Sequence, residues 1–214
     1  AAQTAKQVVL QRLREAEREI VFEEFSEREN EIVTGVIQRI EPKQITLDLG
    51  RTEALLPSTE QVHTEHYRTG QRVKVYILGV NRTAKGPQII VSRTHRNLLR
   101  RLLELEVPEL HQGAIELKAI AREAGQRSKI AVAARQEGID PIGSCVGLRG
   151  IRIQNIVNEL NGEKIDVVQW DSAPAAFIAT LLPPAVSLKW VNFDDRYRVN
   201  LPWPKQTAGD FRIE

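Results

Sequence analysis

The stretch Val146-Gly-Leu-Arg-Gly-Ile-Arg152 places two glycines around a basic residue, where one apolar segment ends and another begins. Upstream, Pro141-Ile-Gly-Ser-Cys-Val146 has the small residues of a short helix, and apolar residues recur downstream at helical spacing from Ile151 to Leu160. Glycine at both corners allows positive φ angles and leaves room for a ligand backbone. The amides and the dipole at the start of the second helix point to the same turn. The turn therefore suits phosphates.

The segments on either side of this turn alternate between helical and strand periodicity. A helix is predicted over 96–105, strands over 115–121 and 128–133, and a last strand over 164–170. The resulting order is α-β-β-α-Gly-x-x-Gly-α-β. A lone Gly-x-x-Gly is a weak signal, but this order resembles a KH domain of the bacterial type. Such a domain clamps a few nucleotides of single-stranded nucleic acid by their backbone.

Composition and charge restrict the class of protein. The 214 residues are 42% hydrophobic, enough for one large domain or two to three small ones with folded cores. The net charge is only +2, so a nucleic-acid surface must come from local segregation of charge. With one cysteine and no apolar run of bilayer length, we expect a reducing cytoplasm and no membrane. No signal peptide and no methionine are present, which favours a chain that begins inside a longer protein.

The first half of the chain changes from helical to strand periodicity. Apolar residues near one face predict a helix over 4–24, whose charged residues we interpret as a solvated face. Short alternating segments separated by Pro or Gly turns then predict five strands, at 32–40, 45–49, 52–56, 72–80 and 87–93. Five short strands in about sixty residues are typical of an OB-fold barrel, which commonly binds oligonucleotides.

This barrel segment resembles the S1 RNA-binding domain. The matching residues are Gly35-Val36, Asp48-Leu-Gly50, Ala54-Leu-Leu-Pro57, Tyr67-Arg-Thr-Gly-Gln-Arg-Val-Lys-Val75 and Ile89-Ile-Val-Ser-Arg93. Ala54 and Leu55 stand where S1 domains often carry an exposed aromatic residue, which removes a stacking contribution of about 1 to 3 kcal/mol per base. Tyr67, Tyr76 and His66 are alternative stacking residues, although a structural role is favoured for each.

The remaining segments complete the domain plan. A helix with few breakers leads from Arg93 to Val107 and Pro108 ends it, so we expect the barrel and the KH domain to hold a defined relation. A further helix over 172–182 and strands over 184–191 and 196–201 repeat the opening of a KH domain without a Gly-x-x-Gly. The predicted domains are a closing helix (1–26), an S1-type barrel (30–94), a first KH domain (95–170) and an incomplete or degenerate second KH domain (171–214).

The order of these domains resembles the NusA family of bacterial transcription elongation factors. The most specific stretches are Gln3-Thr-Ala-Lys-Gln-Val8, Glu106-Val-Pro-Glu-Leu110, residues 119–132, Asp140-Pro-Ile-Gly-Ser-Cys-Val-Gly-Leu-Arg-Gly150 and Gly162-Glu-Lys-Ile-Asp-Val167. The resemblance implies a factor that contacts nascent single-stranded RNA and RNA polymerase and modulates pausing, termination and antitermination. Polymerase would be held mainly by an N-terminal domain of which 4–24 is the closing helix. Other elongation factors are implied as partners, and a monomer without a cofactor is expected.

We predict an RNA site on the KH loop. The backbone amides of 147–151 would hold phosphates together with Arg149 and Arg152, and the adjoining strand edge near 129–132 would read bases. Three further basic residues would extend the positive track. The predicted RNA-binding residues are Gly147, Leu148, Arg149, Gly150, Ile151, Arg152, Arg122, Arg127, Lys129 and Ile130.

Two other functions remain open at this stage. The chain could be the RNA-holding module of a nuclease, but its tight acidic pairs, Glu23-Glu24 and Asp194-Asp195, lie far apart in sequence and suit surface positions. His63-x-x-His66 is a weak metal motif without a cysteine to support it. The chain could also be a protein-interaction scaffold that keeps the KH fold, although Arg149 favours RNA. We therefore predict no catalytic residue, no metal site and no enzyme activity.

Overall fold

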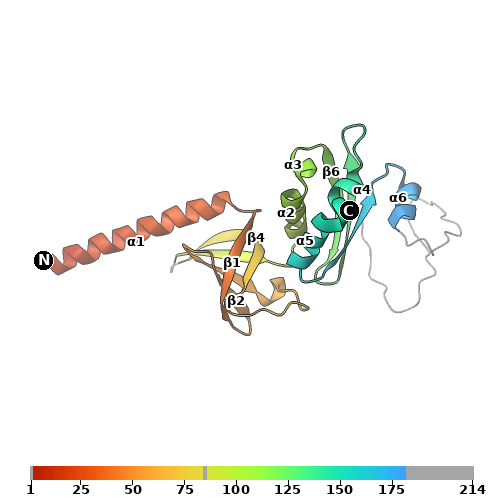
Figure 1. The fold of residues 1–214 in the computed structure, drawn as a ribbon. Coiled ribbons are helices and arrows are strands. Elements are labelled where there is room, and N and C mark those ends of the chain that lie inside the picture. Colours follow the sequence, from red (N-terminus) through yellow and green to blue (C-terminus); the bar gives the residue numbers. More distant parts are fainter. Residues whose placement is uncertain (1, 84–85, 182–214) are drawn as a thin grey trace, which may run out of the picture. The chain divides into compact units, whose positions relative to one another are not determined.

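The computed structural model describes residues 2–83 and 86–181. Its contacts divide the chain into a first unit, residues 1–168, and a second unit, residues 169–214. The first unit contains a long N-terminal helix, a barrel and a helix-and-sheet domain (Figure 1).

The predicted five-stranded barrel is confirmed. Its strands are β1 (Ile32–Ile40), β2 (Gln44–Asp48), β3 (Glu53–Pro57), β4 (Arg72–Thr83) and β5 (Gly86–Ser92), with a short 3-10 turn, η1 (Ser58–Glu60), after β3. They close in the order β1-β2-β3-β5-β4. The β3–β5 pair is parallel and the other pairs are antiparallel. Alternating apolar residues such as Ile37, Leu47 and Val75 are buried inside, as the period of two predicts.

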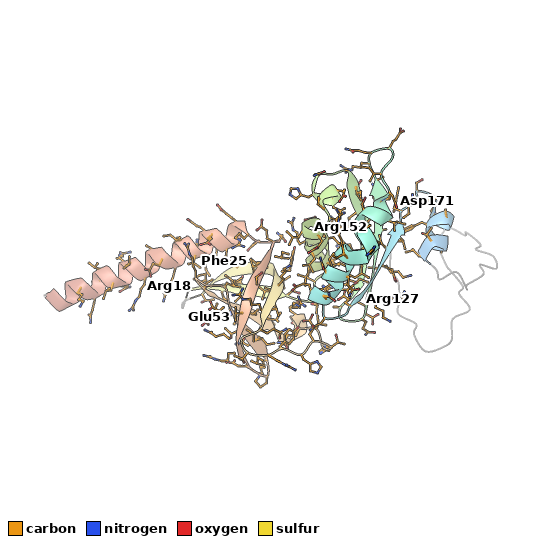
Figure 2. The ribbon with its side chains drawn as sticks, viewed as in Figure 1. Arg18, Phe25, Glu53, Arg127, Arg152 and Asp171 are labelled. Atoms are coloured by element: carbon orange, nitrogen blue, oxygen red, sulfur yellow. The ribbon has the colours of Figure 1, made fainter. Side chains whose placement is uncertain are left out.

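Helix α1 (Ala2–Glu27) is attached to the barrel by its C-terminal part. Phe25 (Figure 2) is 3% exposed and belongs to the barrel core, where burial of such a side chain contributes about 1.5 to 3 kcal/mol. The Arg82 guanidinium of β4 bonds Glu19 and lies 4.1 Å from the centroid of the Phe22 ring. Apolar residues nearer the N-terminus, such as Val9, are exposed.

The predicted KH order is also confirmed. It consists of α2 (Arg96–Glu106), α3 (Pro108–His111), β6 (Ile115–Glu123), β7 (Arg127–Ala134), α4 (Pro141–Val146), the 3-10 turn η2 (Leu148–Gly150), α5 (Ile151–Glu159) and β8 (Lys164–Gln169). The sheet order is β6-β7-β8, so β7 is the central strand. The prediction that residues 129–132 offer a free strand edge is therefore wrong, because the backbone of β7 has a strand on each side.

One buried arginine joins the barrel to the KH domain. Arg93, directly after β5, pairs with Glu65, and both side chains are 2% exposed. Its guanidinium also donates to the carbonyl of Lys74 at 2.8 Å and to that of Glu159, at the end of α5, at 3.0 Å. The guanidinium of Arg93 thus bonds groups of both the barrel and the KH domain.

A stacked pair of rings lies beside this joint. Tyr76 of β4 and His95 stack with ring centroids 4.7 Å apart. His95 caps α2, because its Nδ1 accepts a hydrogen bond from the Asn97 amide at 3.2 Å, and the Asn97 side chain donates to the Tyr76 hydroxyl at 3.1 Å. The start of α2 is thus bound to the barrel wall.

The second unit contains α6 (Pro174–Leu181), which lies within the helix predicted over 172–182. The strands predicted over 184–191 and 196–201 lie outside the described residues. Among the helices of residues 2–83 and 86–181, none is long and apolar enough to cross a bilayer.

Candidate nucleic-acid interface

The loop between α4 and α5 is shaped by two glycines. Gly147 has φ 76° and ψ 173°, a region that is essentially restricted to glycine, and a Cβ there would lie 2.7 Å from Cγ of Arg152. Gly150 has φ 78° and ψ 12°, the left-handed helical region, with open space around it. Asp140 caps α4 by accepting from the Ile142 amide at 3.0 Å. The loop is therefore fixed before any ligand arrives.

Only some of the loop amides are available to a ligand. The Gly147 amide donates to the Gly143 carbonyl at 2.8 Å, the Gly150 amide to the Gly147 carbonyl at 3.0 Å, and the Ile151 amide to the Leu148 carbonyl. The prediction that all five amides hold phosphates is wrong for these three, because they already have acceptors. The Leu148 and Arg149 amides have no acceptor within the described part of the chain. These two neighbouring N–H groups are left for a ligand, and we call them the clamp.

The tip of the loop presents one charge between two apolar side chains. Arg149 is exposed at φ 54°, and its guanidinium has no carboxylate partner among residues 2–83 and 86–181. Leu148 is 84% exposed and Ile151 is 61% exposed. A cation next to exposed apolar surface offers contacts to a phosphate and to the flat face of a sugar or base.

Arg152 (labelled in Figure 2) packs against Gly147 and supports the loop. Its Nη1 bonds the Glu109 carboxylate at 2.9 Å and the Ser144 carbonyl at 2.6 Å. A hydrogen bond from its own backbone amide lowers the pKa of the Glu109 carboxyl most, burial acts in the opposite direction, and the Arg152 guanidinium lowers the pKa further. Because its charge is already paired, Arg152 holds the shape of the loop.

Arg122 is not a surface residue, and its predicted place in a positive track is wrong. Its side chain is 2% exposed and pairs with Glu163, which is 1% exposed. The same carboxylate accepts from the Ser128 hydroxyl at 2.6 Å, and Arg122 also donates to the His95 carbonyl at 2.8 Å. Burial alone would raise the pKa of the Glu163 carboxyl, but the hydrogen bonds from Arg122 and Ser128 outweigh it and the pKa is lowered.

The remaining predicted residues lie on β7. Ile130 is fully buried in the core beneath the helices, so it cannot contact RNA directly. Arg127 (Figure 2) is exposed and bonds Asp166 at 2.6 Å. The Asp166 carboxylate raises the pKa of the Arg127 guanidinium. Lys129 is half-buried on the same strand.

Comparison with known proteins identifies the two domains. A family model described as the NusA-like first KH domain matches residues 93–170, and one described as the S1 RNA binding domain matches residues 26–92. The transcription termination/antitermination protein NusA of Bacillus subtilis (strain 168) is 57% identical over 86% of this chain and 50% of its own length. The chain belongs to the NusA family.

Two further NusA proteins give the same result. The relative from Halalkalibacterium halodurans is 56% identical over 88% of this chain and 50% of its own length. That from Thermus thermophilus is 46% identical over 86% of this chain and 48% of its own length. The chain thus spans about half the length of the curated NusA relatives it matches.

Tyr76, Tyr67 and Cys145 of this NusA-family chain have structural positions, whereas His66 lies at the surface. Tyr76 is 1% exposed, and the Tyr67 hydroxyl accepts from the Val62 amide at 3.1 Å. Burial, with Glu65 nearby, raises the pKa of the Tyr67 phenol well above its usual range. Cys145 is fully buried in α4, and burial raises the pKa of its thiol to about 11. His66 is exposed.

Sequence reasoning missed the acidic residues that organise the site. Glu109 and Glu163 each orient an arginine that the charge pattern had assigned to RNA. The sequence offered no clear signal for either residue, because Glu163 stands between Gly162 and Lys164 and Glu109 stands between Pro108 and Leu110, where an acid is an ordinary surface residue. In the described ranges, 2–83 and 86–181, no three His, Cys, Asp or Glu side chains gather to hold a metal ion.

Proposed function

We propose that this chain is the RNA-contacting part of a transcription termination and antitermination factor, and that it binds nascent single-stranded RNA through the loop between α4 and α5. The observation that carries the proposal is the pair of Leu148 and Arg149 amides, which have no acceptor among the described residues, beside the Arg149 guanidinium, which has no carboxylate partner among them. Backbone amides and a guanidinium are groups that bind phosphate oxygens.

The surroundings of the loop support this proposal. Gly147 lacks the Cβ that would collide with Arg152, so Arg152 can pack against the loop and fix it through Glu109. Gly150 has open space around it, which leaves room for a nucleic-acid backbone. Exposed Leu148 and Ile151 flank the clamp and would contact sugars or bases. The relatives are named for transcription termination and antitermination, which gives the RNA its context as a nascent transcript.

RNA polymerase and other elongation factors are the proposed protein partners. They follow from membership in the NusA family, of whose curated members this chain spans about half. The polymerase contact would be made mainly by a domain joined to α1, whose exposed apolar residues include Val9 and Leu13.

Fluorescence anisotropy with a randomised pool of labelled single-stranded RNA tests the clamp. The double change of Leu148→Asp and Arg149→Asp should weaken binding at least tenfold, because it places two carboxylates where phosphates would lie. If one to three phosphates are neutralised, log K should fall with log salt with a slope of about −0.7 to −2.1.

The matched control places the same two negative charges on α1, as Val9→Asp and Arg12→Asp, since both positions are exposed. This control should bind RNA as the unmodified chain does. Equal binding by the clamp variant would remove the loop as the site, and an affinity independent of salt would contradict phosphate binding.

A further inference from the structure

A polar cavity lies near the end of α5 that is opposite the clamp. It has a volume of about 570 Å³ and is lined by Thr64, His66, Arg68 and Gln71 of the barrel and by Asn161 after α5. The cavity is open to solvent, and its lining is more polar than apolar. The lining side chains are a hydroxyl, an imidazole, a guanidinium and two amides, without a carboxylate. Such a set of groups favours an anionic, hydrogen-bonding occupant.

The barrel side of the cavity is held in place by hydrogen bonds. The Arg68 amide donates to Oε1 of Gln71 at 3.1 Å, and the Gln71 amide donates to the Arg68 carbonyl at 3.1 Å. The Thr64 hydroxyl donates across to the Gly125 carbonyl of the KH domain at 3.2 Å. The loop that carries the cavity residues is therefore bonded both within itself and to the turn between β6 and β7.

The α5 side is fixed by the way the helix ends. Asn161 adopts φ 55°, a left-handed conformation that asparagine tolerates better than most residues. The next amide, of Gly162, donates to the Val157 carbonyl at 2.8 Å and closes the helix end. This termination brings the Asn161 amide group to the cavity wall.

An exposed arginine lies near each end of α5. The Arg68 guanidinium is exposed and has no carboxylate partner in the described ranges, and the same holds for Arg149 at the clamp. The arginines of the KH domain discussed above, by contrast, have acidic partners: Arg122, Arg127 and Arg152. The two ends of one helix thus each have an arginine free to bind a phosphate.

The helix between these ends carries hydrogen-bonding groups without charge. α5 has nine residues, which corresponds to a length of about 13.5 Å. Gln154 and Asn158 are exposed on one face, four residues apart, and Gln154 Nε2 donates to Asn158 Oδ1 at 2.9 Å. Amide side chains match the edges of bases, which makes this face a suitable path for a strand that leaves the clamp.

We propose that the cavity lined by Arg68, His66 and Asn161 is a second subsite for the same RNA strand, which binds a phosphate after the strand has followed α5 from the clamp. The proposal rests on the function proposed above. A KH loop clamps about four nucleotides, so the subsite should be reached only by a longer RNA. Arg68 would pair with the phosphate, and Asn161 and Gln71 would donate to the phosphate or the sugar.

The test compares two randomised, labelled single-stranded RNA pools of about four and about eight nucleotides, titrated against the full chain by anisotropy. Arg68→Glu should weaken binding of the longer pool by about three- to tenfold and leave the shorter pool unchanged. The salt slope for the longer pool should become shallower by about 0.7, the amount for one single-strand phosphate contact. Arg14→Glu on α1 makes the same change in net charge at another exposed position and should leave both pools unchanged.

The clamp variant separates failure of this proposal from failure of the proposed function. If the clamp variant loses both pools while Arg68→Glu loses neither, the clamp stands and the second subsite is overturned. If Arg68→Glu weakens both pools equally, Arg68 belongs to the first binding site and a length-dependent subsite is likewise overturned. If neither variant changes binding, both proposals fail. Arg68 is exposed, and unchanged thermal unfolding of the variant would exclude a folding defect.

Discussion

At the scale of single residues, the site depends on backbone conformation as much as on charge. Gly147 occupies a φ/ψ region that other residues rarely adopt, and Arg149 is a non-glycine residue at positive φ. The charged groups divide into two kinds. Arg122 and Arg152 are engaged by Glu163 and Glu109, whereas Arg149 has no acidic partner in the described part of the chain. The same residue type thus builds the loop at one position and faces outward at another.

The two glycines that flank the clamp, Gly147 and Gly150, should respond differently to substitution. Gly147→Ala should cost about 1 to 3 kcal/mol of unfolding free energy through backbone strain and should also weaken RNA binding, because the new Cβ meets Arg152. Gly150→Asn should cost less than about 1 kcal/mol, since asparagine tolerates the left-handed region and the added Cβ would meet no other part of the described structure. Urea denaturation monitored by circular dichroism measures both. Equal costs at the two positions would contradict the described loop geometry.

At the scale of elements, α2 is the connection between the two domains. Its cap, His95, stacks on Tyr76 of the barrel and accepts from the Asn97 amide. Burial lowers the pKa of the His95 imidazole below its usual range; Arg96 and Arg122 act in the same direction and Glu60 acts against them. The neutral ring, which can accept the capping hydrogen bond, is the form that the folded state favours.

Stability should therefore depend on pH through His95. Because its pKa is lower in the folded state, its contribution is complete above the unfolded pKa of about 6.5 and is lost as pH falls through the folded value. Thermal unfolding measured at intervals from about pH 7.5 to 5 should show this loss. His95→Asn keeps a capping acceptor that does not titrate, so its loss over this range should be smaller. His111→Asn, at an exposed position, should retain the full pH dependence; equal profiles for all three proteins would contradict the role of His95.

At the scale of the whole molecule, the joint makes the barrel and the first KH domain one unit. Arg93, Glu65 and Glu159 come from three segments distant in sequence and meet at one buried guanidinium. Removing one partner of such a buried pair typically costs about 3 to 5 kcal/mol, because the other charge is left uncompensated. A rigid joint would let one RNA strand meet both domains at a fixed spacing.

Backbone ¹⁵N relaxation of the full chain tests this rigidity. Amides of β1 to β5 and of β6 to β8 should report one rotational correlation time. Glu65→Gln should weaken the joint and allow the two sets of values to diverge, whereas Glu41→Gln, an exposed neighbour of Arg39, should not. Two distinct correlation times in the unmodified chain would show that the domains tumble separately.

The sequence predicted the architecture better than it predicted the site. Hydrophobic periodicity located both domains. In the barrel, alternating apolar residues such as Ile37, Leu47 and Val75 place one face of each strand in the interior. The charge pattern assigned Arg122 to an exposed RNA track, because its partner Glu163 lies 41 residues away and only tertiary structure brings the two together. The internal hydrogen bonds of the Gly147, Gly150 and Ile151 amides could not be predicted either, since hydrogen bonds within a turn depend on φ/ψ values that composition does not specify. The central position of β7 depends on strand order, which periodicity leaves open.

The central claim is that the amides of Leu148 and Arg149 receive RNA phosphates, and the most direct measurement is a ¹⁵N–¹H correlation titration of the full chain with short single-stranded RNA. The account predicts that these two amides shift most, that the internally bonded Gly150 and Ile151 amides shift less, and that Leu148→Asp with Arg149→Asp abolishes the shifts of neighbouring α5 amides. Shifts confined to the barrel strands, with the loop amides unchanged at saturating RNA, would contradict it.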